Sequence, residues 1–225
     1  MTSDPIRPCS RMLPSLLCLA VSSMLSTPVL ACAMRSVPAE TVKAPVEGRV
    51  VQAFTCKDAE GEHLFLESRQ LLPQQPAGKS PSLALSFYKF THTSSGNLIK
   101  RWQARDFVTQ DDPQSVPRAP RAPRVDRFVV RDVDGDGLAE AFVSYALPGQ
   151  GLDPDDGKLL VFYKDRKYAI RGAVASGPGD FGTRTMDPGF SALPAAVQTF
   201  ALDLWDAVAL PKGPPPVTLS QARLH

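Results

Sequence analysis

Proline is the feature that most constrains what this chain can fold into. The chain has 225 residues, and 22 of them are prolines scattered along its length. Each proline removes a backbone N–H donor and fixes φ, so this density predicts short elements separated by rigid loops. A hydrophobic content of 43% still allows a packed core. The composition is therefore not that of a helical bundle.

The charge balance by itself does not point to a strongly charged partner. The formal net charge is +2, from 25 basic and 23 acidic residues. A charge this small does not indicate binding to nucleic acid or to an anionic membrane surface. We predict no nucleic-acid partner.

Short apolar runs with β character lie between the prolines. Residues 83–91 and 98–107 flank a Ser-Ser-Gly-Asn turn and predict a β-hairpin. In the first arm Leu83, Leu85 and Phe87 alternate with smaller or polar residues, as in a half-buried strand. Further strands are predicted over residues 63–68, 128–133, 139–147, 158–164 and 167–174, the last two joined through Asp165-Arg166.

Residues 111–126 interrupt this pattern with a repeated Pro-Arg-Ala unit. Such a segment is stiff, basic and unsuited to a sheet. We interpret it as a solvated loop, because basic runs are commonly no more than that. The alternative is an arm that binds an acidic surface.

One helix is predicted near the C-terminus. We predict Ser191 as the N-cap, with Pro194 in the first turn and Pro211 ending the helix. Apolar residues at helical spacing form one stripe that we expect to pack on a sheet. The predicted fold class is therefore mainly β (α+β), an antiparallel sheet with one C-terminal helix packed on it. We predict an extended lead-in over residues 34–44, a single domain over 45–210 and a disordered tail over 211–225.

The first 33 residues have the pattern of a signal peptide. Two arginines form a basic start, residues 12–30 are mostly apolar and uncharged, and Ala31 and Ala33 fit an A-x-A cleavage site. A retained membrane anchor is the alternative, since a spanning helix needs about 20 apolar residues. We predict an exported protein, in the periplasm or outside the cell.

Cys32 leaves the end of this segment open. Residues 29–32 resemble a lipoprotein signal, in which the cysteine becomes the acylated first residue of an outer-membrane lipoprotein. Cleavage before Met34 would leave Cys56 alone in the mature chain. Cleavage before Cys32 would allow lipidation or a Cys32–Cys56 bridge. A membrane contact is expected only if Cys32 is lipidated.

The segment between two of the predicted strands carries the clearest chemistry. Calcium prefers six to eight oxygen ligands, and carboxylates at alternate positions of a tight loop can converge on one ion. Without a cation, the mutual repulsion of these carboxylates would be destabilising. Gly137 permits the sharp turn. We predict a calcium site with side-chain ligands and one backbone carbonyl, formed by Asp132, Asp134, Asp136, Leu138 and Glu140.

Other interpretations of this segment stay open. The loop is not an EF-hand, because its twelfth position is Val143 rather than glutamate and its flanks have strand character. An acidic glycine-rich turn can also connect two strands without a metal. Magnesium would need fewer protein ligands and more water. Zinc and copper are disfavoured, since no His or Cys lies nearby.

The loop resembles the strand–loop–strand calcium sites of integrin-α-type FG-GAP repeats, which carry an acidic residue at the ninth position, here Glu140. Only one copy is present, which excludes a propeller built of such repeats. A longer resemblance, over about residues 60–209, includes Tyr145, residues 158–159 and 167–172, Asp187-Pro188 and Leu204-Trp205. Over this stretch the chain is similar to a small family of exported bacterial proteins labelled as surface polysaccharide biosynthesis proteins. That resemblance implies a cell-envelope location and names no reaction.

The sequence contains no recognisable catalytic constellation. None of the three histidines has a metal-pair spacing, and no Gly-x-Ser-x-Gly elbow is present. We predict a non-catalytic, calcium-binding structural or binding module whose partner is a protein or glycan of the cell envelope. One alternative is an enzyme acting on surface polysaccharide, with Glu67 and Glu140 as its carboxylates. The other is an inhibitor or immunity protein that blocks a partner enzyme through a loop such as residues 111–126.

Overall fold

The computed structural model describes residues 32–72, 83–108, 123–149, 153–175, 177, 180 and 182–209. Most of the predicted signal peptide, most of the Pro-Arg-Ala segment and the predicted tail lie outside these residues. None of the helices in the described part has the length and apolarity needed to cross a membrane.

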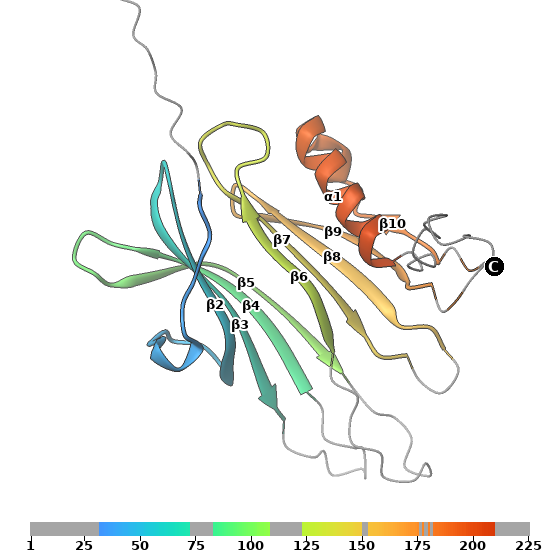
Figure 1. The fold of residues 1–225 in the computed structure, drawn as a ribbon, viewed down its shortest axis with the longest axis horizontal. Helices are drawn as coiled ribbons and strands as arrows, with labels where there is room; N and C mark the ends of the chain where they lie inside the picture. Colours follow the sequence, from blue (N-terminus) through green and yellow to red (C-terminus); the bar gives the residue numbers. More distant parts are fainter. Residues whose placement is uncertain are drawn as a thin grey trace, which may run out of the picture.

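The described residues form two antiparallel five-stranded sheets and one α-helix (Figure 1). Sheet A has the order β1-β2-β3-β4-β5, and sheet B has the order β10-β9-β8-β7-β6. The strands of sheet A are β1 (Arg35–Ser36), β2 (Arg49–Asp58), β3 (Gly61–Leu71), β4 (Leu83–His92) and β5 (Leu98–Val108). Those of sheet B are β6 (Arg124–Arg131), β7 (Glu140–Leu147), β8 (Asp156–Tyr163), β9 (Arg166–Ala173) and β10 (Thr185–Met186). The helices are η1 (Ala39–Thr41), η2 (Phe190–Ala192) and α1 (Ala195–Ala209).

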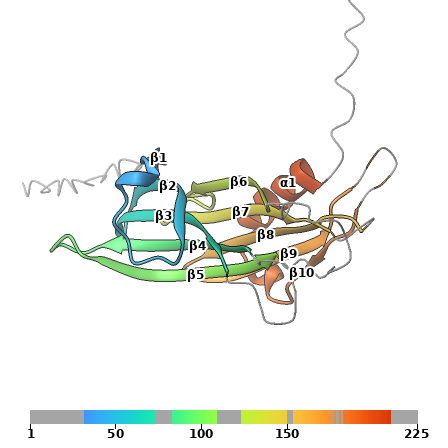
Figure 2. The same cartoon turned by 90° about the horizontal axis from the view of Figure 1, so that it is seen from below.

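The two sheets pack face to face around an aromatic core. Phe128 on β6 meets Phe65 on β3 and Phe87 on β4, with ring centroids 6.3 and 5.8 Å apart. Trp102 on β5 stacks on Phe162 of β8. Alternation along each strand supplies these residues, since every second side chain faces the opposite sheet. The two sheets therefore lie in two layers (Figure 1), and within each sheet the strands run side by side in chain order (Figure 2).

Each sheet also has its outer face covered. Helix α1 lies on the outer face of sheet B, where Val197, Ala201 and Trp205 pack against buried residues of β7, β8 and β9 (Figure 1). The segment before β2 covers the outer face of sheet A with Val37 and other small apolar residues. The predicted lead-in is therefore packed on the sheet, and β1 within it pairs with β2.

The predicted fold class is confirmed: the protein is mainly β, with antiparallel sheets and one C-terminal helix packed on one of them. The predicted hairpin of residues 83–107 is also present as β4 and β5. The prediction did not divide the strands between two sheets. Period-2 alternation is the same whether the buried face meets a helix or a second sheet, so it does not make that distinction.

Three local predictions were wrong. Ser191 does not cap the helix, because it lies inside η2 and α1 begins only at Ala195. Residues 124–126 of the Pro-Arg-Ala segment join sheet B as the start of β6. This position is an edge, where unpaired backbone groups are tolerated. The turn of the second hairpin is Lys164-Asp165, both with positive φ, and not Asp165-Arg166.

Cys32 and Cys56 form a disulfide. The backbone N–H of Cys32 also donates to the carbonyl of Lys57, and both cysteines are buried in the core between the sheets. Of the alternatives predicted for Cys32, the structure therefore contains the bridge. The bond attaches the start of the described chain to the end of β2.

Candidate metal centre

The acidic loop joins β6 to β7, and its local sequence explains its shape. Gly135 and Gly137 have φ values of +75° and +86°, a region that favours glycine. The carboxylate of Asp132 fixes the backbone at both glycines. Its Oδ1 accepts from the N–H of Gly135 at 2.7 Å, and its Oδ2 accepts from the N–H of Gly137 at 3.0 Å. The Asp132 side chain thus supplies hydrogen-bond acceptors to loop N–H groups that are not paired with another strand.

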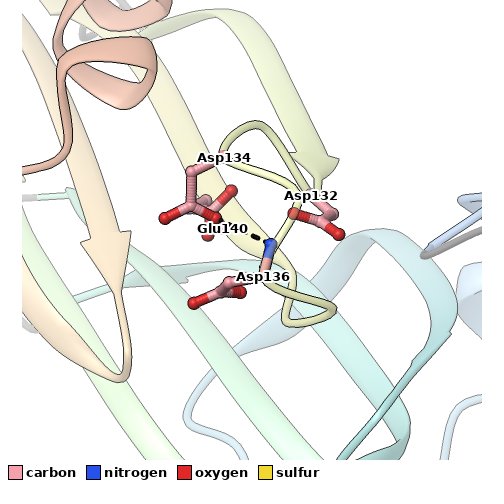
Figure 3. Close-up of side chains that lie close together, drawn as sticks. All are labelled: Asp132, Asp134, Asp136 and Glu140. Carbon is pink, nitrogen blue, oxygen red and sulfur yellow. Dashed lines mark hydrogen bonds between the residues drawn. The ribbon is translucent and has the colours of Figure 1, made fainter.

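Four carboxylates converge in this loop. Asp132, Asp134, Asp136 and Glu140 each offer one oxygen, and these oxygens all lie within 4.8 Å of one another. In Figure 3 Asp134 lies next to Glu140, with Asp136 and Asp132 around the same turn of the loop. The structure therefore brings together all four acidic side chains that the sequence predicts as ligands.

Glu140 is the buried member of the group. It is the first residue of β7 and only 1% exposed, whereas the three aspartates lie nearer the surface. Its Oε2 accepts from the backbone N–H of Val133 at 2.7 Å. Burial raises the pKa of Glu140 to about 7, and the neighbouring aspartates add to this rise while the Val133 hydrogen bond opposes it. A cation in the loop would favour the charged form instead.

Leu138 has its predicted place in the loop. Its backbone N–H donates to Oδ1 of Asp136 at 2.9 Å, which fixes the peptide next to the carboxylates. The role of its carbonyl as a metal ligand stays a prediction.

The end of β2 and the β2–β3 turn of sheet A contact the acidic loop through two hydrogen bonds. The N–H of Ala59 donates to the carbonyl of Gly137 at 3.0 Å, and the N–H of Ala139 donates to Oδ2 of Asp58 at 3.0 Å. These two contacts join a turn of one sheet to a loop of the other. The position of the acidic loop is therefore tied to the packing of the two sheets.

Asp58 belongs to a buried polar chain that the sequence analysis did not identify. Its Oδ1 lies 2.8 Å from Nε2 of His63, and Nδ1 of His63 lies 2.9 Å from Oγ1 of Thr91. The pKa of Asp58 is lowered, because hydrogen bonds from His63 and Ala139 outweigh the effect of burial. Burial lowers the pKa of His63. No sequence motif predicts this chain, since its members belong to three neighbouring strands and β2 itself was not predicted.

One ammonium contacts the carboxylates. Nζ of Lys164, in the turn between β8 and β9, lies 3.0 Å from Oδ2 of Asp136. Three turns or loops therefore meet at this end of the sandwich: β2–β3, β6–β7 and β8–β9.

The donor set defines the chemistry that the site can support. It consists of carboxylate oxygens, and no His or Cys belongs to the group among the described residues. Hard divalent cations prefer such ligands. The coarse prediction of a group able to hold a metal ion is therefore in agreement with the structure, while the identity of the ion is a matter for proposal.

The glycosidase interpretation gains no support from Glu67. This residue is fully buried, and its Oε1 forms an ion pair with Nε of Arg69 at 2.8 Å. Burial raises its pKa, although Arg69 opposes the rise. Among the described residues, Oε2 of Glu67 has no hydrogen-bond partner. Glu67 thus lacks the access to solvent that a carboxylate acting on a glycan needs.

Comparisons with known proteins do not assign a family. No protein-family model matches the chain, and neither a curated protein nor a solved structure matches it. Fold and site together define a two-sheet β-sandwich with an acidic loop at one end.

Proposed function

We propose that the protein is a non-catalytic, calcium-binding module exported to the bacterial cell envelope. The observation that carries this proposal is the convergence of four carboxylates within 4.8 Å at a loop with one ammonium contact. Carboxylates this close together repel one another unless a cation neutralises them.

Calcium fits this loop better than other ions. Three aspartates and one glutamate provide enough oxygens for most of a calcium shell, and the Leu138 carbonyl and water would complete it. Magnesium binds at shorter distances, demands near-octahedral geometry and usually retains several waters. A site with this many protein carboxylates therefore favours calcium.

The bound ion would act on the whole sandwich. The loop contacts the β2–β3 turn of sheet A through Gly137 and Ala139. A ligand that binds only the folded protein stabilises it by mass action. Calcium would thereby hold the two sheets together at this end.

Two observations support export. The residues before Cys32 have the pattern of a signal peptide, and cleavage before Cys32 would retain both cysteines of the disulfide in the mature chain. The Cys32–Cys56 disulfide is a feature of proteins in oxidising compartments. A sulfur in a disulfide carries no lipid, so we propose an exported protein in the periplasm or outside the cell rather than a lipoprotein. The partner we propose is a protein or glycan of the envelope.

The experiment is calorimetric titration of the purified mature protein with calcium chloride and with magnesium chloride. We expect one calcium per chain and weaker binding of magnesium. Asp134→Asn should weaken calcium binding at least tenfold, because it removes one charged ligand. Asp153→Asn is the matched control, since Asp153 is an exposed aspartate in the β7–β8 connection. Loss of calcium binding in both variants, or in neither, would contradict the assignment.

A further inference from the structure

The β8–β9 turn brings a positive charge to the acidic loop. Nζ of Lys164 lies 3.0 Å from Oδ2 of Asp136, although the two residues belong to different turns. The other oxygen of Asp136 accepts from the N–H of Leu138. The ammonium therefore contacts the carboxylate oxygen that the loop backbone leaves available.

The fold builds the position of this lysine. Lys164 and Asp165 form a tight two-residue turn in which both have positive φ, +48° and +60°. Asp165 is anchored to sheet A, because its carboxylate accepts from Nζ of Lys89 at 3.0 Å and from Nε of Arg101 at 2.7 Å. The backbone of the turn is thereby held, while the Lys164 side chain is about half exposed. Because a lysine has a flexible four-carbon stem, its ammonium can leave Asp136 without a change in the turn.

Tyr163 provides a second contact for the ammonium. Nζ of Lys164 lies 5.1 Å from the centre of the Tyr163 ring, within the range of a cation–π interaction. The hydrogen bond to Asp136 raises the pKa of Lys164, and the interaction with Tyr163 adds to this rise. A lysine ammonium is a cation at physiological pH even at its ordinary pKa.

We propose that Lys164 is a tethered counter-ion that competes with the metal for Asp136 and so sets the affinity of the site. The inference rests on the proposed function, a divalent-cation site in the β6–β7 loop. When the ammonium is on Asp136, it offsets part of the repulsion among the carboxylates. Metal binding then weakens or displaces the ammonium contact, because a divalent ion and the ammonium repel one another when both approach the same carboxylate oxygen.

The tether also favours divalent over monovalent ions. A group held by the chain next to its partner acts at a high effective concentration, on the order of millimolar or above for short connections. A sodium or potassium ion carries the same charge as the ammonium and would have to displace it without an electrostatic advantage. A divalent ion brings twice the charge to four carboxylates. Lys164 is thus a specificity-determining residue of the proposed site.

The test compares Lys164→Gln with Lys167→Gln in the otherwise unchanged mature protein. Glutamine retains a Cβ and an unbranched side chain, so the backbone preference at this turn position is little changed. Lys167 is another exposed lysine of the same hairpin, and its substitution controls for the loss of one positive charge in the neighbourhood. Calcium chloride titration and thermal unfolding in EDTA are measured for the three proteins.

We expect Lys164→Gln to bind calcium about three- to tenfold more tightly, since the competing charge is gone. In EDTA the same variant should melt at a lower temperature than the parent, while Lys167→Gln should match the parent in both measurements. Opposite signs in the two measurements distinguish competition from a general loss of stability.

Equal or weaker calcium binding by Lys164→Gln would overturn the inference, and calcium binding by the parent protein would then still uphold the proposed function. An equal gain in affinity in Lys164→Gln and Lys167→Gln would also overturn it, because a general charge effect would explain the result. If no protein in the series binds calcium, the proposed function fails, and the competition fails with it.

Discussion

Two regions of this molecule differ in how the negative charge of their acidic side chains is balanced. Between the sheets, Asp165 pairs with Lys89 and Arg101, and Asp106 accepts from Tyr145 and Lys158. In the β6–β7 loop, four carboxylates share one contacting ammonium among the described residues, and their other partners are the Tyr163 side chain and N–H groups of the loop. The first region is neutralised by the chain itself, and the second is not.

The difference separates two uses of acidic residues. A buried carboxylate with its own partners is part of the packing, and removal of the carboxylate leaves those partners unsatisfied. A group of carboxylates with too few partners destabilises the fold unless a cation arrives. The comparison predicts opposite consequences when a charge is removed from each region.

The largest effect is expected at Asp58. Asp58→Ala would leave His63 and the N–H groups of Glu60 and Ala139 without their acceptor. We expect a loss of about 3–5 kcal/mol in the free energy of unfolding, measured by urea denaturation in EDTA. Asp153→Ala at the exposed control position should change this energy by less than about 0.5 kcal/mol. Similar values for the two variants would contradict the role of Asp58 as the acceptor that these three groups need.

The next effect concerns pH. In EDTA the folded-state pKa of Glu140, about 7, lies above its ordinary value of 4.5, so folding favours the protonated form. This contribution is fully present below the ordinary pKa and is lost as the pH rises through about 7. Up to about 3 kcal/mol should therefore disappear between these limits. Urea denaturation of Glu140→Gln at pH 5 and pH 8 should show a smaller difference than the parent. If the free energy of unfolding changed equally with pH in Glu140→Gln and in the parent, the raised pKa of buried Glu140 would be contradicted.

A smaller loss is expected at Asp165. Asparagine tolerates the positive φ of this position, so Asp165→Asn tests the charge rather than the turn. Lys89 would remain nearly buried with its ion pair gone. We expect a loss of about 2 kcal/mol in the free energy of unfolding, measured by urea denaturation. An unchanged value would show that this carboxylate is not needed to match Lys89.

The smallest change, with the opposite sign, is expected in the loop. Asp134→Asn removes one of four repelling charges and keeps an acceptor for the N–H of Asp136. In EDTA we expect a gain of between zero and about 1 kcal/mol, measured by urea denaturation. In calcium the sign should reverse, because a ligand is lost. Destabilisation by a similar amount in both conditions would show that Asp134, like Asp165, stabilises the fold through its own partners and not through a cation.

Much of the fold was predictable from local pattern, and the partnerships between sheets were not. The alternation in residues 83–91 and 98–107 identifies β4 and β5, since each strand has one face toward the core. Strand β2 was not predicted, because its apolar residues are separated by Gln52, Thr55 and Lys57 without a long run. The division into two sheets depends on long-range pairing, which local periodicity does not contain.

The site follows the same rule. The acidic ligands lie within nine residues of one loop, so their spacing alone predicts that they converge. Lys164, Asp58 and Ala59 reach the loop from other turns. Their roles depend on how the two sheets stack, and no sequence signal was available to find them.

Thermal unfolding of the mature protein in EDTA, followed by addition of calcium or magnesium, tests the central claim most directly. We predict that saturating calcium raises the melting temperature by about 5–10 °C, that magnesium raises it less, and that Asp134→Asn reduces the rise caused by calcium. If the melting temperature were the same in EDTA, in calcium and in magnesium, the account would be contradicted, since the β6–β7 loop would then be an acidic turn that binds neither ion.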